Sequence, residues 1–117
     1  MKKIAIIIAS HQGVAPALII HRELPETELF YAGEGQENPC TSIDSIPAFV
    51  AANFTRYEGL VFIGALGICV RAIAPCIHSK YTDPAVVNID STGKHVISVL
   101  SGHVGGANEL TRRLASI

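Results

Sequence analysis

Two glycine-rich stretches contain the residues of this sequence whose types and spacing could do chemistry. Residues 101–108 are SGHVGGAN and residues 64–67 are GALG. Each stretch follows an apolar run and precedes a helical pattern, so it leaves backbone amides bare at a helix N-terminus. Glycine lets a ligand come close to such amides. The pattern therefore predicts sites for anions, with phosphates or carboxylates as the expected ligands.

Side chains in and beside these stretches extend the prediction. His103 is the candidate general base, because an imidazole changes charge near neutral pH. Arg71 follows the first stretch and could pair with a carboxylate. The residues assigned to substrate binding are Gly64, Gly67, Arg71, Gly102, Gly105, Gly106 and Asn108, and those assigned to catalysis are His103 and Ser101.

Each assignment has a plainer alternative, which the sequence leaves open. His103 could hold its loop by bonding a neighbouring carbonyl, and Arg71 could be a surface charge. The glycines could serve only to make tight strand-to-helix turns. Ser101 lacks the G-x-S-x-G context of a serine nucleophile, so we expect it to donate to an oxyanion instead. Asp83 precedes Pro84, and we interpret it as the start of a turn.

Several other chemistries are excluded. Neither stretch is a P-loop, because GK[ST] is absent, and G-x-G-x-x-G is absent too. Cys69, Cys76 and His78 match no zinc spacing, so we expect no metal bound by the chain. A formal net charge of −1 and the lack of tryptophan disfavour nucleic acid as a partner. The apolar runs are too short to span a membrane. Three cysteines without a C-x-x-C pair indicate reduced thiols and a cytoplasmic protein.

The elements that must position these residues alternate along the chain. Apolar runs predict strands over 4–9, 28–33, 60–66, 85–90 and 95–101. Helical spacing predicts helices on the stripes Val14–Leu18–Ile19, Ile46–Val50–Phe54 and Ala107–Leu110–Leu114–Ile117, with a short helix over 67–74. We expect Ser42 or Ser45 to cap the second helix and Gly59 to end it. Residues 91–94 predict a hairpin turn.

This alternation predicts an α/β fold, a three-layer α/β/α sandwich around a mixed sheet of about five strands with one antiparallel strand. If the two glycine-rich stretches build one site, both must lie at the same edge of the sheet. That condition predicts that strand 95–101 runs parallel to strand 60–66 and that strand 85–90 is the antiparallel one.

Three segments of the second half carry a family resemblance. They are GLVFIGALGICVRAIAPCI, TDPAVVNID and GKHVISVLSGHVGGANELTRRLA, in this order between residues 59 and 115. Together they resemble the N-terminal domain of CbiG, the cobalt-precorrin-5A hydrolase family of cobalamin biosynthesis. The first half of the chain resembles this family only in general shape.

The resemblance implies a substrate and a reaction. The substrate would be a cobalt-bearing, ring-contracted tetrapyrrole with a δ-lactone. Water would open the lactone, a two-carbon fragment would leave as acetaldehyde, and cobalt-precorrin-5B would remain. The cobalt would belong to the substrate, and the chain would bind no cofactor. The alternative is a non-catalytic module that binds the tetrapyrrole or another anion and positions it for another domain.

The resemblance also implies partners. Enzymes of this family continue into a separate C-terminal domain, and the last helix here has no Gly or Pro stop signal. We therefore expect residues 1–117 to form a single domain that works with a C-terminal domain or a fused enzyme of the cobalamin pathway. Whether the chain also forms a homodimer stays open.

Overall fold

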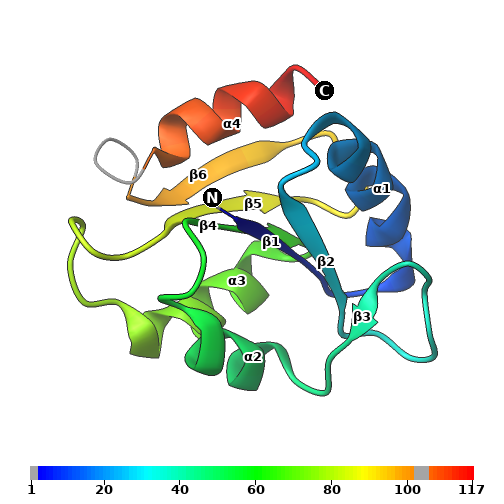
Figure 1. Ribbon diagram of the computed structural model, residues 1–117, viewed down its shortest axis with the longest axis horizontal. Helices are drawn as coiled ribbons and strands as arrows, with labels where there is room; N and C mark the ends of the chain where they lie inside the picture. Colours follow the sequence, from blue (N-terminus) through cyan, green and yellow to red (C-terminus); the bar gives the residue numbers. More distant parts are fainter. Residues whose placement is uncertain (1–2, 102–105) are drawn as a thin grey trace.

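A computed structural model describes residues 3–101 and 106–117 of the chain (Figure 1). The strands are β1 Ile4–Ile8, β2 Thr27–Tyr31, β3 Thr41–Ser42, β4 Gly59–Ile63, β5 Ala85–Ile89 and β6 Val96–Leu100. The α-helices are α1 Val14–Glu23, α2 Ile46–Asn53, α3 Leu66–Ile73 and α4 Ala107–Ala115. Short 3₁₀ turns, η1 His11–Gly13 and η2 Ala74–Cys76, precede α1 and follow α3.

The strands form one mixed sheet in the order β3-β2-β1-β4-β5-β6. All neighbours are parallel except β5 and β6, which are antiparallel. The predicted α/β fold with one antiparallel strand is confirmed, and the short β3 makes it a six-stranded sheet. The prediction of which strand is antiparallel was wrong: the strand that runs against the rest is β6, not β5. The reason is that α3 carries the chain over the sheet from β4 to a parallel β5, whereas a tight turn joins β5 to β6.

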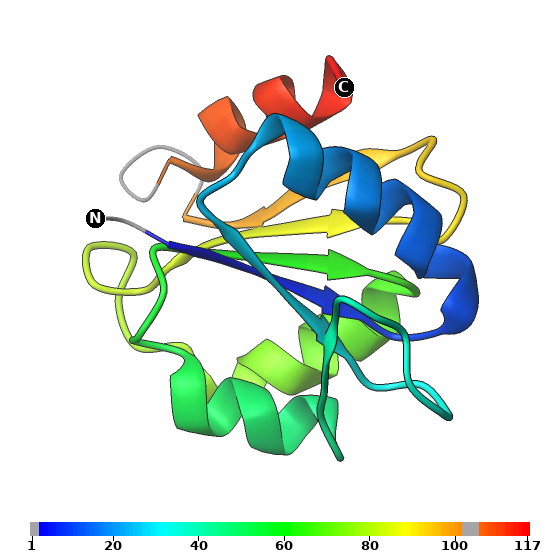
Figure 2. The same ribbon diagram turned by 45° about the vertical axis from the view of Figure 1, so that its right-hand side comes forward.

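Helices cover both faces of the sheet (Figures 1 and 2). The side chains of β1 alternate between two cores, because successive residues of a strand point to opposite faces. Ile6 and Ile8 pack with α1 and α4. Ala5 and Ile7 pack with α2 and α3. The result is the predicted three-layer sandwich.

Local interactions set the ends of α2. The Ser45 hydroxyl accepts a hydrogen bond from the Ala48 amide at 3.3 Å, so Ser45 is the cap, while Ser42 lies in β3. The prediction that Gly59 ends this helix was wrong: the helix ends at Asn53, and Gly59 begins β4. A Cβ at Gly59 would lie 3.3 Å from Ile4 Cγ1 and 3.4 Å from Leu110 Cδ2, which indicates that the position needs a small residue for packing.

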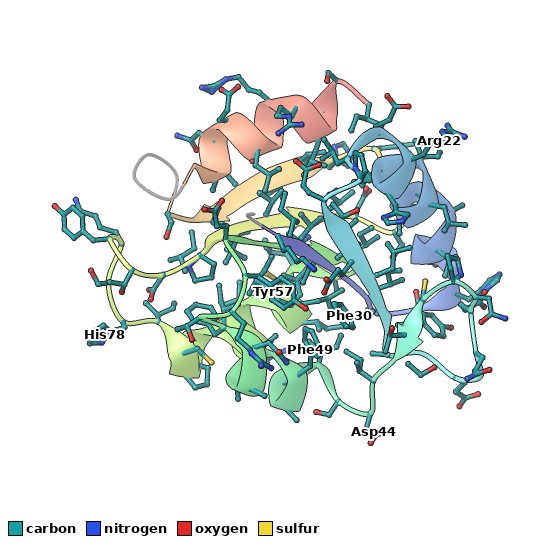
Figure 3. All side chains as sticks on the ribbon, in the orientation of Figure 1. Arg22, Phe30, Asp44, Phe49, Tyr57 and His78 are labelled. Atoms are coloured by element: carbon teal, nitrogen blue, oxygen red, sulfur yellow. The ribbon has the colours of Figure 1, made fainter. Side chains whose placement is uncertain are left out.

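An aromatic cluster joins α2 to the sheet (Figure 3). The ring centroids of Phe30 and Phe49 are 4.4 Å apart, and Phe30 meets Tyr57 edge-on at 6.2 Å. The Tyr57 hydroxyl donates to Glu28 Oε1 at 2.7 Å, and Lys3 Nζ contacts Glu28 Oε2 at 2.8 Å. Burial, with the hydrogen bond to Glu28, raises the pKa of Tyr57 to about 12. This polar contact closes the outer end of the apolar cluster.

Candidate functional site

The first glycine-rich stretch lies at the carboxyl edge of the parallel strands. Gly64 follows β4, has φ +153°, and a Cβ there would lie 2.8 Å from the Cβ of Ala9. Its amide donates to the Ile89 carbonyl at 2.9 Å, and its carbonyl accepts from Asn88 Nδ2 at 3.3 Å. Gly64 therefore has a structural reason to be glycine, since both its conformation and its contact with Ala9 disfavour a side chain.

Arg71 folds back over the start of α3. A Cβ at Gly67 would lie 3.5 Å from Arg71 Nη1, so the guanidinium reaches toward the first turn of its own helix. Ala65, the N-cap residue, offers no side-chain acceptor to that turn. Arg71 is exposed and forms no ion pair within residues 3–101 and 106–117. Positive charge and uncapped amides thus gather at one place, an arrangement suited to an anion.

The described residues of the second stretch, Ser101 and 106–108, lie at the opposite end of the sheet. Ser101 has φ +60° and is buried, and its hydroxyl donates to the Asp83 carbonyl at 3.4 Å. Its carbonyl accepts from the Ala107 amide at 3.1 Å, and Gly106, with φ +87°, precedes α4. The predicted site residues Gly102, His103 and Gly105 lie outside the described residues.

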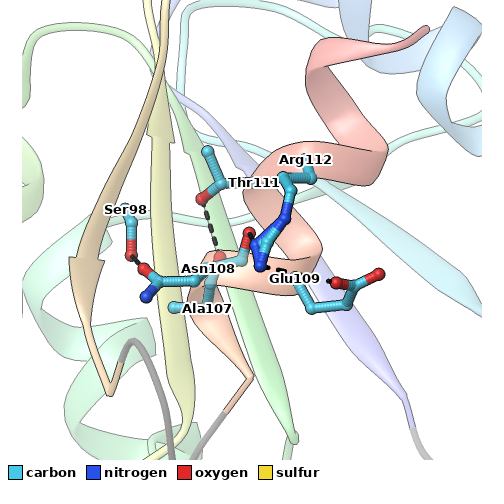
Figure 4. A network of polar contacts seen from close by, with 6 residues as sticks. All are labelled: Ser98, Ala107, Asn108, Glu109, Thr111 and Arg112. Atoms are coloured by element: carbon cyan, nitrogen blue, oxygen red, sulfur yellow. Dashed lines mark hydrogen bonds and ion pairs between the residues drawn. The ribbon is translucent and has the colours of Figure 1, made fainter.

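Asn108 is tied to the neighbouring strand (Figure 4). The Ser98 hydroxyl donates to Asn108 Oδ1 at 2.9 Å, which joins α4 to β6. In the same turn of α4, the Thr111 hydroxyl donates to the Ala107 carbonyl at 2.7 Å. The carboxamide oxygen of Asn108 is therefore already engaged, and only its amino group is left to donate to a ligand.

The two stretches do not build one compact site. Because β6 is antiparallel, its end beside Ser101 pairs with the beginning of β5, with Val86 opposite Leu100. Gly64 instead lies beside the end of β5, where its amide meets Ile89. The opposite directions of β5 and β6 can be followed in Figure 2. The prediction that both stretches lie at the same edge was wrong.

Two carboxylates have structural roles. Asp83 Oδ2 accepts from the amides of His78 at 2.9 Å and Ser79 at 3.1 Å. The interpretation of Asp83 as the start of a turn was wrong: Asp83 closes the turn that precedes it, where its amide donates to the Ser79 carbonyl at 2.8 Å. Asp90 organises the β5–β6 hairpin, a role that the sequence reasoning missed, although an acidic residue before Ser-Thr-Gly is typical of such turns. Backbone hydrogen bonding from His95, with further bonds from Thr92 and Lys94, lowers the pKa of Asp90.

The cysteines form no disulfide. Burial raises the pKa of the Cys69 thiol to about 12, so this thiol is protonated and unreactive at neutral pH. Within the described ranges, no three His, Cys, Asp or Glu side chains gather as a metal site. The helices of those same ranges are also too short or too polar to cross a membrane.

Comparison with known proteins identifies the family. The chain is 46% identical to a cobalt-precorrin-5A hydrolase of Salmonella typhimurium over 99% of its length, and 41% identical to one of Priestia megaterium over 96%. Its fold is similar to the crystal structure of a putative cobalamin biosynthesis protein G homolog from Sulfolobus solfataricus, with a TM-score of 0.74, 26% identity and 97% of the chain covered. The chain spans 33%, 32% and 33% of these three proteins, about a third of each. Residues 48–117 match the family described as Cobalamin synthesis G N-terminal, and the chain belongs to this family.

Proposed function

We propose that this chain is the N-terminal part of a cobalt-precorrin-5A hydrolase of the anaerobic cobalamin pathway. The observation that carries the proposal is the 46% identity to the Salmonella typhimurium hydrolase over nearly the whole chain. The reaction opens the δ-lactone of cobalt-precorrin-5A with water and releases acetaldehyde, giving cobalt-precorrin-5B. The cobalt is carried by the substrate. We place the activity in the cytoplasm, where the three free thiols stay reduced.

The proposed substrate carries several acetate and propionate groups, and the carboxyl edge of the sheet is suited to bind them. The guanidinium of Arg71 can form charge-assisted hydrogen bonds with a carboxylate. The uncapped first turn of α3, with Gly64 and Gly67, can donate backbone amides to the same group. These roles account for the unpaired charge of Arg71.

Lactone hydrolysis also needs a base for the water and donors for the acyl oxyanion. We assign the base to His103 and the donors to the second glycine-rich stretch, with Gly102 and the amides of Gly105 and Gly106. Asn108 can donate through Nδ2. Ser101 already donates to the Asp83 carbonyl, so its hydroxyl must leave that partner before it can bind an oxyanion.

The remaining two-thirds of such an enzyme is a proposed partner. Because the relatives are about three times as long as this chain, groups outside the matched third can take part in catalysis. The alternative function follows from the same observation: the chain would bind and position the tetrapyrrole, and the other part would supply the base.

An acetaldehyde-release assay with cobalt-precorrin-5A tests the proposal. The assay compares the chain alone with a chimera in which it replaces the matching third of the Salmonella typhimurium hydrolase. Acetaldehyde release by the chimera supports the proposed function. Tetrapyrrole binding by the chain, combined with full activity of the chimera after His103→Asn, would support the positioning module. A folded chimera that neither binds the substrate nor releases acetaldehyde contradicts both.

A further inference from the structure

Strand β6 has one face covered by a helix and one face that is only partly covered. Helix α4 packs on the face that carries Ser98, as the Ser98–Asn108 hydrogen bond shows (Figure 4). On the other face, α2 and α3 pack over β1 and β4, and their core cluster reaches Val86 of β5 and the partly buried Val99 and Leu100 of β6. Asn88 pairs with Ile97, so both side chains rise from this second face. Ile97, near the beginning of β6, is 42% exposed, because the α2/α3 cluster reaches only Val99 and Leu100 at the other end of the strand.

Aliphatic side chains border the exposed beginning of β6. Leu66 and Val70 lie one turn apart on α3 and are 41% and 45% exposed. The right-handed β4–α3–β5 connection turns their side of the helix toward β6. Ile77, after η2, is 49% exposed. We name these four residues, Leu66, Val70, Ile77 and Ile97, the β6–α3 surface. Such a group of exposed aliphatic residues indicates a binding surface.

An unsatisfied polar atom lies at the base of this surface. Asn88 is 2% exposed, and its Nδ2 is used by the Gly64 carbonyl. Its Oδ1 is buried and accepts no hydrogen bond within the described part of the chain. A buried acceptor without a donor costs free energy, so its retention beside Ile97 calls for an explanation. A donor supplied by a bound molecule or its water would satisfy it.

Three cations lie close in the chain to the residues of this surface. Arg71 lies on α3, Lys94 precedes β6, and Lys80 lies in the turn before β5. None of the three forms an ion pair within residues 3–101 and 106–117. The carboxylates of Asp83 and Asp90 accept hydrogen bonds from backbone amides of their own turns. The Lys80 ammonium lies over the ring of Tyr81, 5.4 Å from its centroid. An apolar surface with neighbouring cations that lack ion pairs is complementary to a flat apolar molecule with carboxylates at its rim.

We infer that the β6–α3 surface binds the face of a tetrapyrrole macrocycle, with the rim carboxylates of the ligand directed to Arg71, Lys80 and Lys94. This inference rests on the proposed function and locates its substrate. The five residues of β6 extend over about 17 Å, a length comparable with a macrocycle and its side chains. One ligand on this strand reaches both the Gly64–Gly67 turn and the Ser101 end of β6. The surface therefore explains how segments at opposite edges serve the same substrate.

Titration of the chain with cobyrinic acid, a cobalt corrinoid with free carboxylates, tests the inference by visible absorbance. Ile97→Glu places a charge under the macrocycle and should weaken binding at least about tenfold. The matched control is Ile19→Glu on α1, which is similarly exposed on the opposite face and should change affinity less than about twofold. Arg71→Gln should weaken binding of the free acid. The heptamethyl ester of cobyrinic acid lacks the carboxylates, so Arg71→Gln should leave the affinity for the ester unchanged. Thermal unfolding confirms that each variant folds.

Several outcomes would overturn the inference. They are no binding by the wild-type chain, equal weakening by Ile19→Glu, and unchanged affinity in a folded Ile97→Glu. If Ile97→Glu instead disrupts a dimer, or abolishes binding of the remaining part of the Salmonella typhimurium hydrolase, while corrinoid affinity is kept, the surface binds protein. The proposed function fails separately: it fails if the wild-type chimera binds corrinoid but releases no acetaldehyde from cobalt-precorrin-5A.

Discussion

Gly64 approaches Ala9 so closely that a Cβ on residue 64 would lie 2.8 Å from the Cβ of Ala9. This contact holds the turn after β4 against the end of β1, beside the start of α3. We predict that Gly64→Ala lowers the free energy of unfolding by about 1–3 kcal/mol, because it adds a clash to an unfavourable φ. Urea unfolding measures the change. The control is Gly35→Ala: Gly35 has φ +76°, but a Cβ there would meet no atom within 4 Å in the described part of the chain. If both variants lose the same stability, the contact with Ala9 contributes nothing.

Asp83 should be a strong stability determinant although it flanks the predicted site. Its buried carboxylate accepts two backbone hydrogen bonds in the turn before β5. We expect Asp83→Ala to cost about 1.5–3 kcal/mol, the range for hydrogen bonds to a charged acceptor. Thermal and urea unfolding should agree on this loss. Asp44→Ala, at an exposed position, should stay within about 0.5 kcal/mol of wild type. An equally stable Asp83→Ala would contradict the structural role.

Ionisation of Tyr57 should lower the stability of the folded chain at high pH. Its pKa is raised to about 12 in the folded chain from an ordinary value of 10.0, so the folded state holds the proton more tightly than the unfolded state. The stabilisation is therefore complete below pH 10 and declines as the pH rises toward 12. Tyr57→Phe should flatten the decline between these values in unfolding measurements. Tyr81→Phe, at a 72% exposed side chain, should leave the slope as it is in wild type.

Arg71 should determine affinity for a carboxylate-bearing tetrapyrrole. Loss of a charge-assisted contact costs about 1.5–3 kcal/mol, so Arg71→Ala should raise the Kd at least about tenfold. Arg71→Lys should recover only part of the affinity, because a lysine lacks the bidentate geometry of the guanidinium. Arg22→Ala on α1 removes an exposed charge from the opposite face and serves as the control (Figure 3). Unchanged affinity in Arg71→Ala would show that Arg71 is a surface charge without a role in binding.

His103 is the residue whose replacement should most reduce the rate of lactone opening. Loss of a general base lowers a rate by roughly 10²–10⁴-fold, and His103→Asn should show this in acetaldehyde release by the chimera. The melting temperature is measured alongside. A large loss of rate with an unchanged melting temperature supports the base. A small loss of rate with a lowered melting temperature would mark His103 as structural. His78→Asn, in the turn before β5, is the control.

The sequence by itself determined the elements and the family. The stripe of Ala107, Leu110, Leu114 and Ile117 predicted α4. The first three side chains are buried in the structure, whereas Ile117 lies beyond the end of the helix and is 43% exposed. The turn at 91–94 predicted the hairpin. These features depend on residues near one another in the chain, where periodicity and turn chemistry act directly. The motif order between residues 59 and 115 was also enough to indicate the family that the comparisons show.

Only the tertiary structure decided how the candidate site residues are arranged. A hairpin shows that two strands are antiparallel to each other, but not which of them is parallel to the rest of the sheet. The crossover through α3 makes β5 the parallel strand and β6 the antiparallel one. This choice separates Gly64 from Ser101 and leaves Ile97 exposed on the face of β6 opposite α4. Exposed Ile97 and the unsatisfied Asn88 Oδ1 could not be predicted, because both depend on which helices cover which strands. Such packing is set by contacts between residues far apart in the sequence, which local pattern does not contain.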